Sequence, residues 1–294
     1  MQNKFRNCLQ VLFISLLAAF VLTGCTKEDL SECYKPRFRL TVKAFDADNK
    51  EVGAEQIKDI TLYIFDKEKA FIASQNVNYA ELITLDYPYN DHLTVVVWAN
   101  GKQGHQTMPT LKRGDHLETA FVSLIYTKAA LPVAGSPDDL FFGTIDMEAD
   151  ASSENIIRVI RKTSGVVVTA RYLKEYVGAT DDDFHYVLRK SSDKLDFYGK
   201  PNGTDVSYMP AAEFDKEGDY VSSLFNIFST DSDIKIDIYY HNVLQTTIIS
   251  DDQGKPLRAV EGRLLNVFVS FKGSVSVSVS VTPWGEKQIW KDFN

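Results

Sequence analysis

The sequence predicts an all-β protein, built as two tandem β-sandwich domains that follow a lipoprotein signal peptide. From Lys35 onward, apolar and polar residues alternate with a period of two, which is typical of strands that bury one face. Turn-forming residues interrupt these runs about every eight to twelve residues, a spacing typical of sandwiches. No segment keeps a helical period, and we expect one turn of helix at most, around residues 211–220.

The N-terminal segment has the layout of a secretory signal. Lys4 and Arg6 provide positive charge, and Leu9 to Leu22 is an almost unbroken apolar run. That run is shorter than the roughly 20 residues that span a bilayer, so cleavage is expected and residues 1–24 are excluded from the fold. An uncleaved membrane anchor is the alternative interpretation.

The segment Leu22-Thr23-Gly24-Cys25 resembles a bacterial lipobox. Small residues before the cysteine give a peptidase access to the backbone, and the thiol is the nucleophile that accepts the lipid. Each buried CH₂ group contributes about 0.8 kcal/mol, so several acyl chains on Cys25 hold a protein firmly on a membrane. The mature protein is therefore expected to begin at Cys25 and to continue through a lipidated tether over residues 25–35.

The first predicted domain covers residues 36–150. The run RFRLTVKAF (37–45) places Phe38 and Leu40 on a buried face, and residues 58–77 give two strands joined by a charged turn at 66–69. The run LTVVVWAN, ending at Asn100-Gly101, is apolar on both faces, which indicates a fully buried strand before a turn. A further strand includes Leu140 to Ile145.

A small, acidic stretch near Glu148 marks the predicted boundary, and residues 151–294 form the second predicted domain. Its first two strands flank Thr163-Ser164-Gly165, and further strands recur up to the end of the chain, among them two short ones, FHYVLRKSS (184–192) and KLDFYG (194–199). In the last strand, SVSVSVSVTPW, valines occupy one face and serines the other, so one face alone should be buried.

Composition and cysteine count exclude several classes of protein. Removal of residues 1–24 takes away two cations and no acid, so the formal charge changes from −8 to −10. An acidic chain without a basic cluster argues against nucleic acid as a partner. With Cys8 removed and Cys25 lipidated, Cys33 has no intramolecular partner, so we expect no disulfide framework. An intermolecular disulfide through Cys33 is the alternative to an idle thiol.

No catalytic residue, metal site or cofactor is predicted. The acidic stretch 46–55 lacks the glycine and glutamate of a calcium-binding EF-hand loop, and Asp181–Asp183 has the pattern of an acidic loop. Asp138 and Asp139 are expected to be turn residues, because glycosidase acids face each other across a substrate. The five histidines show no metal-binding spacing, and no nucleophile elbow or phosphate loop occurs.

The order of these motifs resembles the FimB-like fimbrial anchor and accessory subunits of Bacteroides-type bacteria. The match comprises the lipobox cysteine, EDLSEC, ITLYIFDKEKAF, VVVWAN, DLFFG, IIRVIRKTSGVVVTARY and the C-terminal valine strand before Trp284. The resemblance implies two transthyretin-like (Greek-key) sandwiches, a lipid on Cys25, and a surface-exposed position on the cell outer membrane. It also implies fimbrial shaft subunits as partners, assembly by β-strand donation, and a contribution to cell adhesion as base anchor, tip or accessory subunit.

Two further signals near the N-terminus follow from this resemblance. Lys27, Glu28 and Asp29 resemble the tag that directs lipoproteins of these bacteria to the cell surface, with a solvated tether as the alternative. Polymerising relatives are cut after an arginine, and Arg37 and Arg39 lie near a comparable position. Cleavage there would release the domains from the lipid and make this a shaft or tip subunit.

Two other functions remain open from the residues alone. A surface glycan-binding lipoprotein would share the tether and the sandwiches, and could use tyrosines as a platform. The candidates for such a platform are Tyr172, Tyr176, Tyr186, Tyr239 and Tyr240. A lipoprotein hydrolase would need two carboxylates facing a common cleft, and the sequence offers no such pair. For a surface-exposed binding lipoprotein, the partners would be host or bacterial surface glycans or proteins.

Overall fold

The structure, a computed structural model, describes residues 37–285 except for residues 103, 128, 130, 151 and 231. Contacts divide the chain into two units, Met1–Lys35 and Pro36–Asn294. The first unit lies outside the described residues, and so do the predicted signal peptide and tether. Among the helices of the described part, none is long and apolar enough to cross a membrane.

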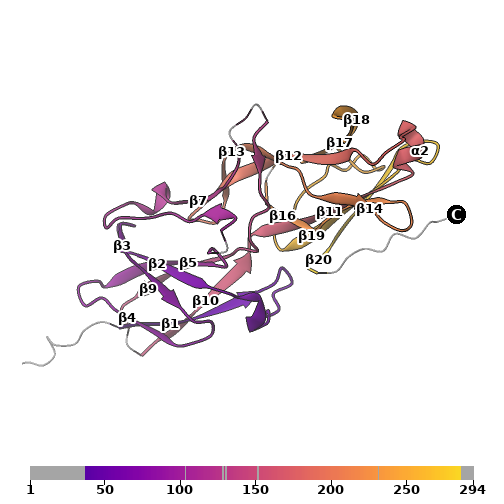
Figure 1. Cartoon of the computed structure of the whole chain (residues 1–294). Coiled ribbons are helices and arrows are strands. Elements are labelled where there is room, and N and C mark those ends of the chain that lie inside the picture. Colours follow the sequence, from indigo (N-terminus) through magenta and orange to yellow (C-terminus); the bar gives the residue numbers. More distant parts are fainter. Residues whose placement is uncertain are drawn as a thin grey trace, which may run out of the picture. The chain divides into compact units, whose positions relative to one another are not determined.

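The described chain is almost entirely β-structure, which confirms the predicted all-β class (Figure 1). The strands of its first half are β1 (Arg37–Phe45), β2 (Ile60–Phe65), β3 (Phe71–Val77), β4 (Ile83–Asp86), β5 (His92–Ala99), β6 (Gln106–Thr107), β7 (Phe121–Leu124), β8 (Val133–Ala134) and β9 (Phe141–Glu148). The remaining strands are β10 (Glu154–Arg161), β11 (Thr163–Arg171), β12 (Phe184–Asp196), β13 (Pro201–Tyr208), β14 (Ala212–Phe214), β15 (Tyr220–Ser222), β16 (Phe225–Phe228), β17 (Lys235–Tyr240), β18 (Val243–Ile248), β19 (Arg263–Ser270) and β20 (Ser276–Pro283).

The first sheet has seven strands in the order β3-β2-β5-β9-β10-β1-β4. Strands β9 and β10 pair only through Ile160 with Phe142 and Arg161 with Phe141, and then diverge. The sheet therefore folds into two layers, β3-β2-β5-β9 and β10-β1-β4, that enclose one hydrophobic core. That core buries Phe38 and Leu40 of β1 together with apolar side chains of β2, β4, β5, β9 and β10.

The strands predicted in this region are present with the predicted inward faces. Strand β1 has the predicted bounds, and Ile60, Leu62 and Ile64 of β2 point into the core. Strand β5 is buried on both faces, because the opposite face, which includes Val96 and Trp98, belongs to a second core. This double burial explains why its sequence is apolar throughout.

Two further sheets make up the rest of the described chain. One has the order β14-β15-β11-β19-β20, with β16 also paired to β11, and β11 runs parallel to β19. The other has the order β18-β17-β12-β13-β8, with β7 paired to the end of β12 and β6 paired to β7. Strand β12 is one continuous strand of 13 residues, although its sequence suggests two shorter ones.

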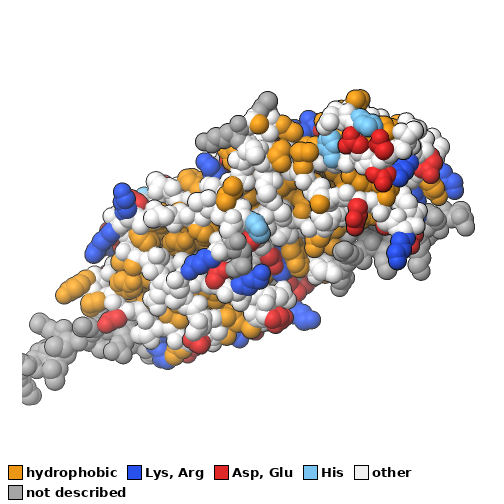
Figure 2. Space-filling model, viewed as in Figure 1, with side chains coloured by type: hydrophobic (Ala, Val, Ile, Leu, Met, Phe, Trp, Pro, Cys, Tyr) orange, Lys and Arg blue, Asp and Glu red, His pale blue; other side chains and the backbone are white. Residues whose placement is uncertain are grey.

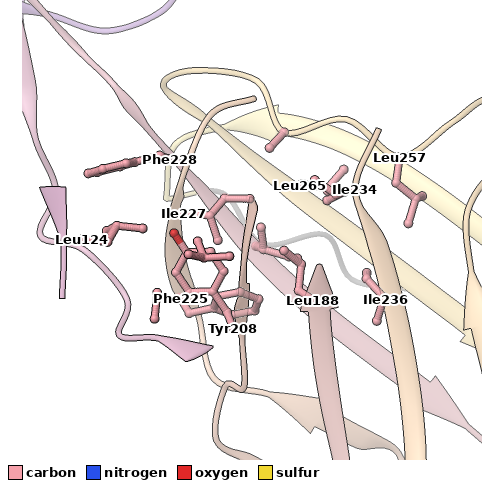
Figure 3. Packing of buried hydrophobic residues seen from close by; sticks show 14 of the residues in the cluster. Leu124, Leu188, Tyr208, Phe225, Ile227, Phe228, Ile234, Ile236, Leu257 and Leu265 are labelled. Atoms are coloured by element: carbon pink, nitrogen blue, oxygen red, sulfur yellow. The ribbon is translucent and has the colours of Figure 1, made fainter. Parts of the chain in front are cut away.

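The second core lies between these two sheets and extends onto β2 and β5. Figure 3 shows side chains from β7, β12, β13, β16, β17 and β19 converging there. The labelled members are Leu124, Leu188, Tyr208, Phe225, Ile227, Phe228, Ile234, Ile236, Leu257 and Leu265. Phe197, just beyond β12, packs edge-on against Tyr63 of β2 at a ring distance of 4.9 Å, so the core is continuous with the outer face of β2.

The predicted turn of helix near residues 211–220 is wrong. Residues 212–214 form β14 and Tyr220 begins β15, while the α-helical turn found within the described residues is α2 (Leu173–Val177). Two left-handed residues, Tyr172 with φ 60° and Gly178 with φ 70°, limit α2 to five residues. Such a short helix leaves no periodicity that a sequence pattern could reveal.

The predicted division at residue 150 remains a prediction. Strand β10 lies in the first sheet beside β1, and β7 pairs with β12, so the polypeptide crosses between sheets on both sides of that position. Where Gly143 of β9 passes Arg158 of β10, the backbones lie so close that a Cβ atom on the glycine would be 2.3 Å from the carbonyl oxygen.

Candidate functional site at strand β20

Strand β20 lies at the edge of its sheet and offers part of its backbone for pairing. It pairs with β19 along its whole length, from Ser276 opposite Ser270 to Pro283 opposite Arg263, and no described strand pairs with its other edge. The N–H of Val277 points outward and donates to Asp252 Oδ1 (2.7 Å), and its carbonyl accepts from the Asp252 N–H (3.0 Å). Because backbone groups alternate, those of Val279 and Val281 point outward as well.

The outward edge is limited at both ends. Asp252 occupies the groups of Val277, and Pro283 has no N–H to donate. An added strand could therefore pair with Val279 and Val281, which places the open backbone in a short, defined segment.

The valine face of β20 is only partly buried, which corrects the prediction that the whole face is buried. Val277 is buried in the second core with 8% of its surface exposed, whereas Val275, just before the strand, is 39% and Val281 is 46% exposed. The alternation of valine and serine is present, but the core extends only under Val277 and, in part, Val279. Exposed valines beside an open strand edge are a feature expected of a surface that receives another chain.

The end of β20 is held by a buried cation. The indole of Trp284 lies over the guanidinium of Arg161, 4.2 Å from its carbon to the ring centre, and Phe141 lies 4.7 Å away. Arg161 donates two hydrogen bonds to Asp139, at 2.6 and 2.9 Å, and a third to Gln56. Only 2% of the Arg161 side chain is exposed, so its charge is neutralised by Asp139 and stabilised by two rings.

A cavity of about 520 Å³ opens next to this cluster. Its lining comes from the loop after β1, the start of β9, the turn before β19 and the end of β20, and it includes Asp48, Asn100, Asp138, Arg161, Arg263 and Trp284. Arg263 forms a two-pronged ion pair with Asp48 at 2.5 and 2.8 Å. This hydrogen bond lowers the pKa of the Asp48 carboxyl. The Asn100 side-chain amide donates to the backbone carbonyls of Gln56 and Asp139, and these hydrogen bonds join two segments of the cavity wall.

Asp138 and Asp139, predicted as turn residues, both hold the fold together in front of β9. Asp139 pairs with Arg161, and Asp138 is buried and accepts hydrogen bonds from Gln106 and from the ring of His105 at 2.6 Å. The sequence did not single out Arg161. No sequence pattern distinguishes an arginine whose side chain points into the core from one that is exposed on the same strand. Trp284 was recognised only as the end of the valine strand.

The other acidic stretches are turns. Asp46 accepts hydrogen bonds from the N–H groups of Asp48 and Lys50, both at 2.9 Å. Asp181 and Asp183 lie on either side of His241, whose ring nitrogens are 3.1 and 3.0 Å from their carboxylates. The pKa of the Asp181 carboxyl is lowered, mainly because this group accepts a hydrogen bond from the N–H of Asp183. Within the described residues, no group of three or more metal-ligating side chains is arranged to hold an ion.

The five tyrosines considered as a glycan platform do not form one surface. Tyr186 is fully buried, donates to the Tyr220 carbonyl at 2.7 Å, and has its pKa raised by burial. Tyr240 packs on Phe184, whereas Tyr239 points to the opposite face of β17 and stacks flat on His185 with ring centres 4.9 Å apart.

The predicted sites near the N-terminus are only partly within the described chain. Cys25, Lys27, Glu28 and Asp29 lie outside the described residues. Arg37 begins β1 opposite Asp86 of β4, and Arg39 is paired on both sides, with Thr84 and Glu154.

These features define a class of protein. Stacked sheets with an open strand edge, and no metal-ligating cluster among the described residues, are typical of β-sandwich proteins that pair with strands of other chains. The sequence model of the fimbrillin-A associated anchor proteins Mfa1 and Mfa2 matches residues 30–290. The chain therefore belongs to this family, which confirms the resemblance drawn from the motifs.

Known proteins agree with this assignment. The major fimbrium anchoring subunit FimB of Porphyromonas gingivalis is 27% identical over 299 residues, which cover 95% of this chain and 96% of FimB. The solved fimbrial anchor protein Mfa2 of the same species has a TM-score of 0.63 at 12% identity, over 84% of this chain and 96% of Mfa2. A candidate polysaccharide-binding protein of Bacteroides thetaiotaomicron has a TM-score of 0.66 at 18% identity, over 84% and 96% of the two chains.

Membership of this family indicates the general role of the chain. The family consists of anchor proteins of fimbriae, so the chain has a role as a fimbrial subunit at the cell surface, in association with other fimbrial subunits. The solved structures, at these identities, show the fold alone.

Proposed function

We propose that this chain is a lipid-anchored subunit of surface fimbriae that holds a shaft subunit by β-strand exchange and thereby supports cell adhesion. Its N-terminal cysteine, Cys25, would carry the lipid in the outer membrane, and Lys27, Glu28 and Asp29 would direct display on the outer face. The open edge of β20 is the observation that supports the exchange, because the outward backbone groups of Val279 and Val281 pair with no described strand and lie beside the exposed side chain of Val281.

The exchange is tested by a charge placed on this edge. Val281→Lys should reduce the amount of shaft subunit that is cross-linked to this protein on cells, because Val281 is exposed and a lysine on an edge strand opposes pairing with another strand. Val243→Lys is the matched control, since Val243 lies on the edge strand β18 and is 61% exposed. Equal cross-linking of both variants and the natural protein would show that β20 is not the exchange edge.

The lipid anchor is tested separately. Cys25→Ala should abolish lipidation and release the protein from membranes, whereas Cys33→Ala should leave it membrane-bound. Intact-mass measurement of both proteins, with fractionation of the cells, gives the answer. A Cys25→Ala protein that remains in the membrane fraction would overturn the lipid anchor and would favour an uncleaved N-terminal helix.

We infer that the chain is retained on its lipid, as an anchor requires, and is not cut after Arg37 or Arg39. Arg39 lies in a strand with partners on both sides, and a cut there would remove Phe38, which is buried in the first core. A protease binds its substrate in an extended form, so β1 would have to leave the sheet first. The mass of the protein isolated from cells should correspond to a chain that starts at Cys25. A mass that corresponds to a chain start at residue 38 or 40 would indicate a shaft or tip subunit.

Binding of surface glycans is the second candidate function. The flat stack of Tyr239 on His185 offers an aromatic surface, and one similar structure is described as a candidate polysaccharide-binding protein. Affinity electrophoresis in gels that contain surface polysaccharides should show retardation that Tyr239→Ala removes. Unchanged mobility in every polysaccharide would exclude this function.

A further inference from the structure

The loop between β4 and β5 carries the most exposed large hydrophobic side chain of the described residues. The Asn90 N–H donates to the Tyr87 carbonyl (3.1 Å), which closes a turn with Pro88 and Tyr89 at its centre. Proline fixes the backbone angle at the first of these positions, so the turn is stiff. Tyr89, at the second, is 98% exposed. A rigid turn that presents a whole tyrosine ring to its surroundings is suited to contact, because the ring is already positioned.

A cation without an ion pair among the described residues lines the same groove as this ring. Tyr89 and Arg113 line the same groove of about 320 Å³, together with Phe71, Ile72 and Tyr87. Arg113 is exposed and has no ion pair among the described residues. The neighbouring acids Asp66 and Asp115 are engaged, since their carboxylates accept the N–H groups of Ala70 and Lys112. Figure 2 shows hydrophobic side chains standing out from the surface at the β3–β4 end, with cationic side chains near them.

The position of this loop in the fold indicates its partner. Asp86, three residues before Tyr89, is the strand partner of Arg37 in the antiparallel register of β4 and β1, and Arg37 is the first residue of β1. The chain thus enters the described fold beside this loop, and only eleven residues separate Cys25 from Arg37. Eleven residues span at most about 40 Å when fully extended, and considerably less otherwise. If Cys25 carries the lipid, the tether therefore keeps the Tyr89 loop within reach of the membrane surface.

We propose that Tyr89 and Arg113 contact the phospholipid surface and fix the orientation of the lipid-anchored protein. The proposal rests on the lipid at Cys25 proposed above. Tyrosine places its ring among lipid headgroups with the hydroxyl in water, and arginine pairs with headgroup phosphate. Either contact is weak alone, but the lipid makes it intramolecular, so a high effective concentration compensates for the low affinity.

The test uses the full lipidated protein in vesicles of phosphatidylethanolamine and phosphatidylglycerol. In a Cys33→Ser background, Tyr89→Cys carries a polarity-sensitive fluorophore, and the vesicles contain a spin-labelled lipid as quencher. The matched control is Gln253→Cys, in an exposed turn between β18 and β19. We expect quenching at position 89 and none at position 253. Adding Arg113→Gln should reduce the quenching at position 89, because about a fivefold loss of contact is expected for each cation removed from the surface.

The outcomes separate the two proposals. Flotation of the protein with vesicles reports the lipid anchor, and quenching reports the contact. Flotation with equal fluorescence at positions 89 and 253 overturns the membrane contact alone. Failure to float overturns the lipid anchor, and the membrane contact with it. A change at position 89 that needs an added fimbrial subunit, and not vesicles, would identify a protein as the partner of the loop.

Discussion

Gly143 shows how one residue permits the close approach of two strands. Any side chain at this position would place its Cβ 2.3 Å from the Arg158 carbonyl oxygen and 3.0 Å from Val159. A backbone oxygen cannot rotate away, so β9 and β10 would have to move apart directly beside the last residues that pair them, Phe142 and Ile160.

We expect Gly143→Ala to lower the free energy of unfolding by about 3 kcal/mol, at the upper end of the range for overpacking. Gly135→Ala is the control, because its Cβ would meet no atom within 4 Å, and a change within about 0.5 kcal/mol is expected. Denaturant unfolding measures both. Equal stability of the two variants would contradict the close approach of β9 and β10.

Arg161 is the buried charge on which the end of β20 depends. Its removal would leave Asp139 without a cation, and breaking one partner of a buried pair costs about 3–5 kcal/mol. Arg161→Ala should therefore strongly destabilise the protein in thermal or denaturant unfolding. Arg258→Ala, which removes the exposed partner of Asp233, should cost less than about 1 kcal/mol.

Buried tyrosines make the fold sensitive to high pH. Burial, assisted by the charge of Asp59, raises the pKa of Tyr63 to about 12, and burial also raises the pKa values of Tyr186 and Tyr208. The unfolded chain releases these protons near pH 10 while the folded chain retains them. Stability is thus unaffected below pH 10 and falls as the pH rises above it.

For Tyr63 the loss should be about 1.4 kcal/mol per pH unit between pH 10 and 12. Unfolding at a series of pH values measures the slope, and Tyr63→Phe should make it shallower. An identical slope in the variant would show that Tyr63 ionises as freely in the folded protein as in the unfolded chain.

At the scale of elements, β20 is held at two points and open between them. Asp252 binds the backbone at Val277, and Trp284 covers Arg161 at the other end. This arrangement keeps the strand in its own sheet while leaving part of its edge available.

Trp284→Ala should loosen only the far end of the strand, because the Asp252 contact is unaffected. We expect faster amide hydrogen exchange at Thr282, which pairs with Leu264, and unchanged exchange at Ser276 and Ser278. Uniformly faster exchange along β20 would show that the strand opens as a whole and that the indole does not act locally.

At the scale of the whole molecule, the second core joins segments far apart in the sequence. Phe197 follows β12 yet packs on Tyr63 and Trp98, and β10 completes the layer that contains β1. Residues on either side of position 150 thus depend on each other for burial.

A fragment that ends at residue 150 tests the predicted domain division. We expect residues 36–150 to remain unfolded, because without β10 one side of β1 is unpaired and the outer faces of β2 and β5 are uncovered. Circular dichroism and calorimetry of this fragment, with residues 36–285 as the reference, give the answer. A cooperative transition in the fragment would establish a boundary at residue 150.

Local pattern predicted much of the secondary structure. Strand β1, the pair β2–β3 and the buried strand β5 follow from alternation and burial that are encoded residue by residue. The helical turn α2 and the continuity of β12 were missed, because both depend on neighbours and not on a local period. The partly exposed valine face of β20 was also missed, since alternation indicates which residues share a face but not how far a core extends.

By itself, the sequence determined the all-β class, the expectation of a lipid on Cys25 and the family, because each of these depends on residue types in a fixed order. Tertiary structure alone decided that β9 and β10 diverge, that Arg161 lies between Trp284 and Asp139, and that Tyr89 stands beside the entry of the chain. These are contacts between residues distant in sequence. Their free energy comes from burial and charge neutralisation, which no local pattern records.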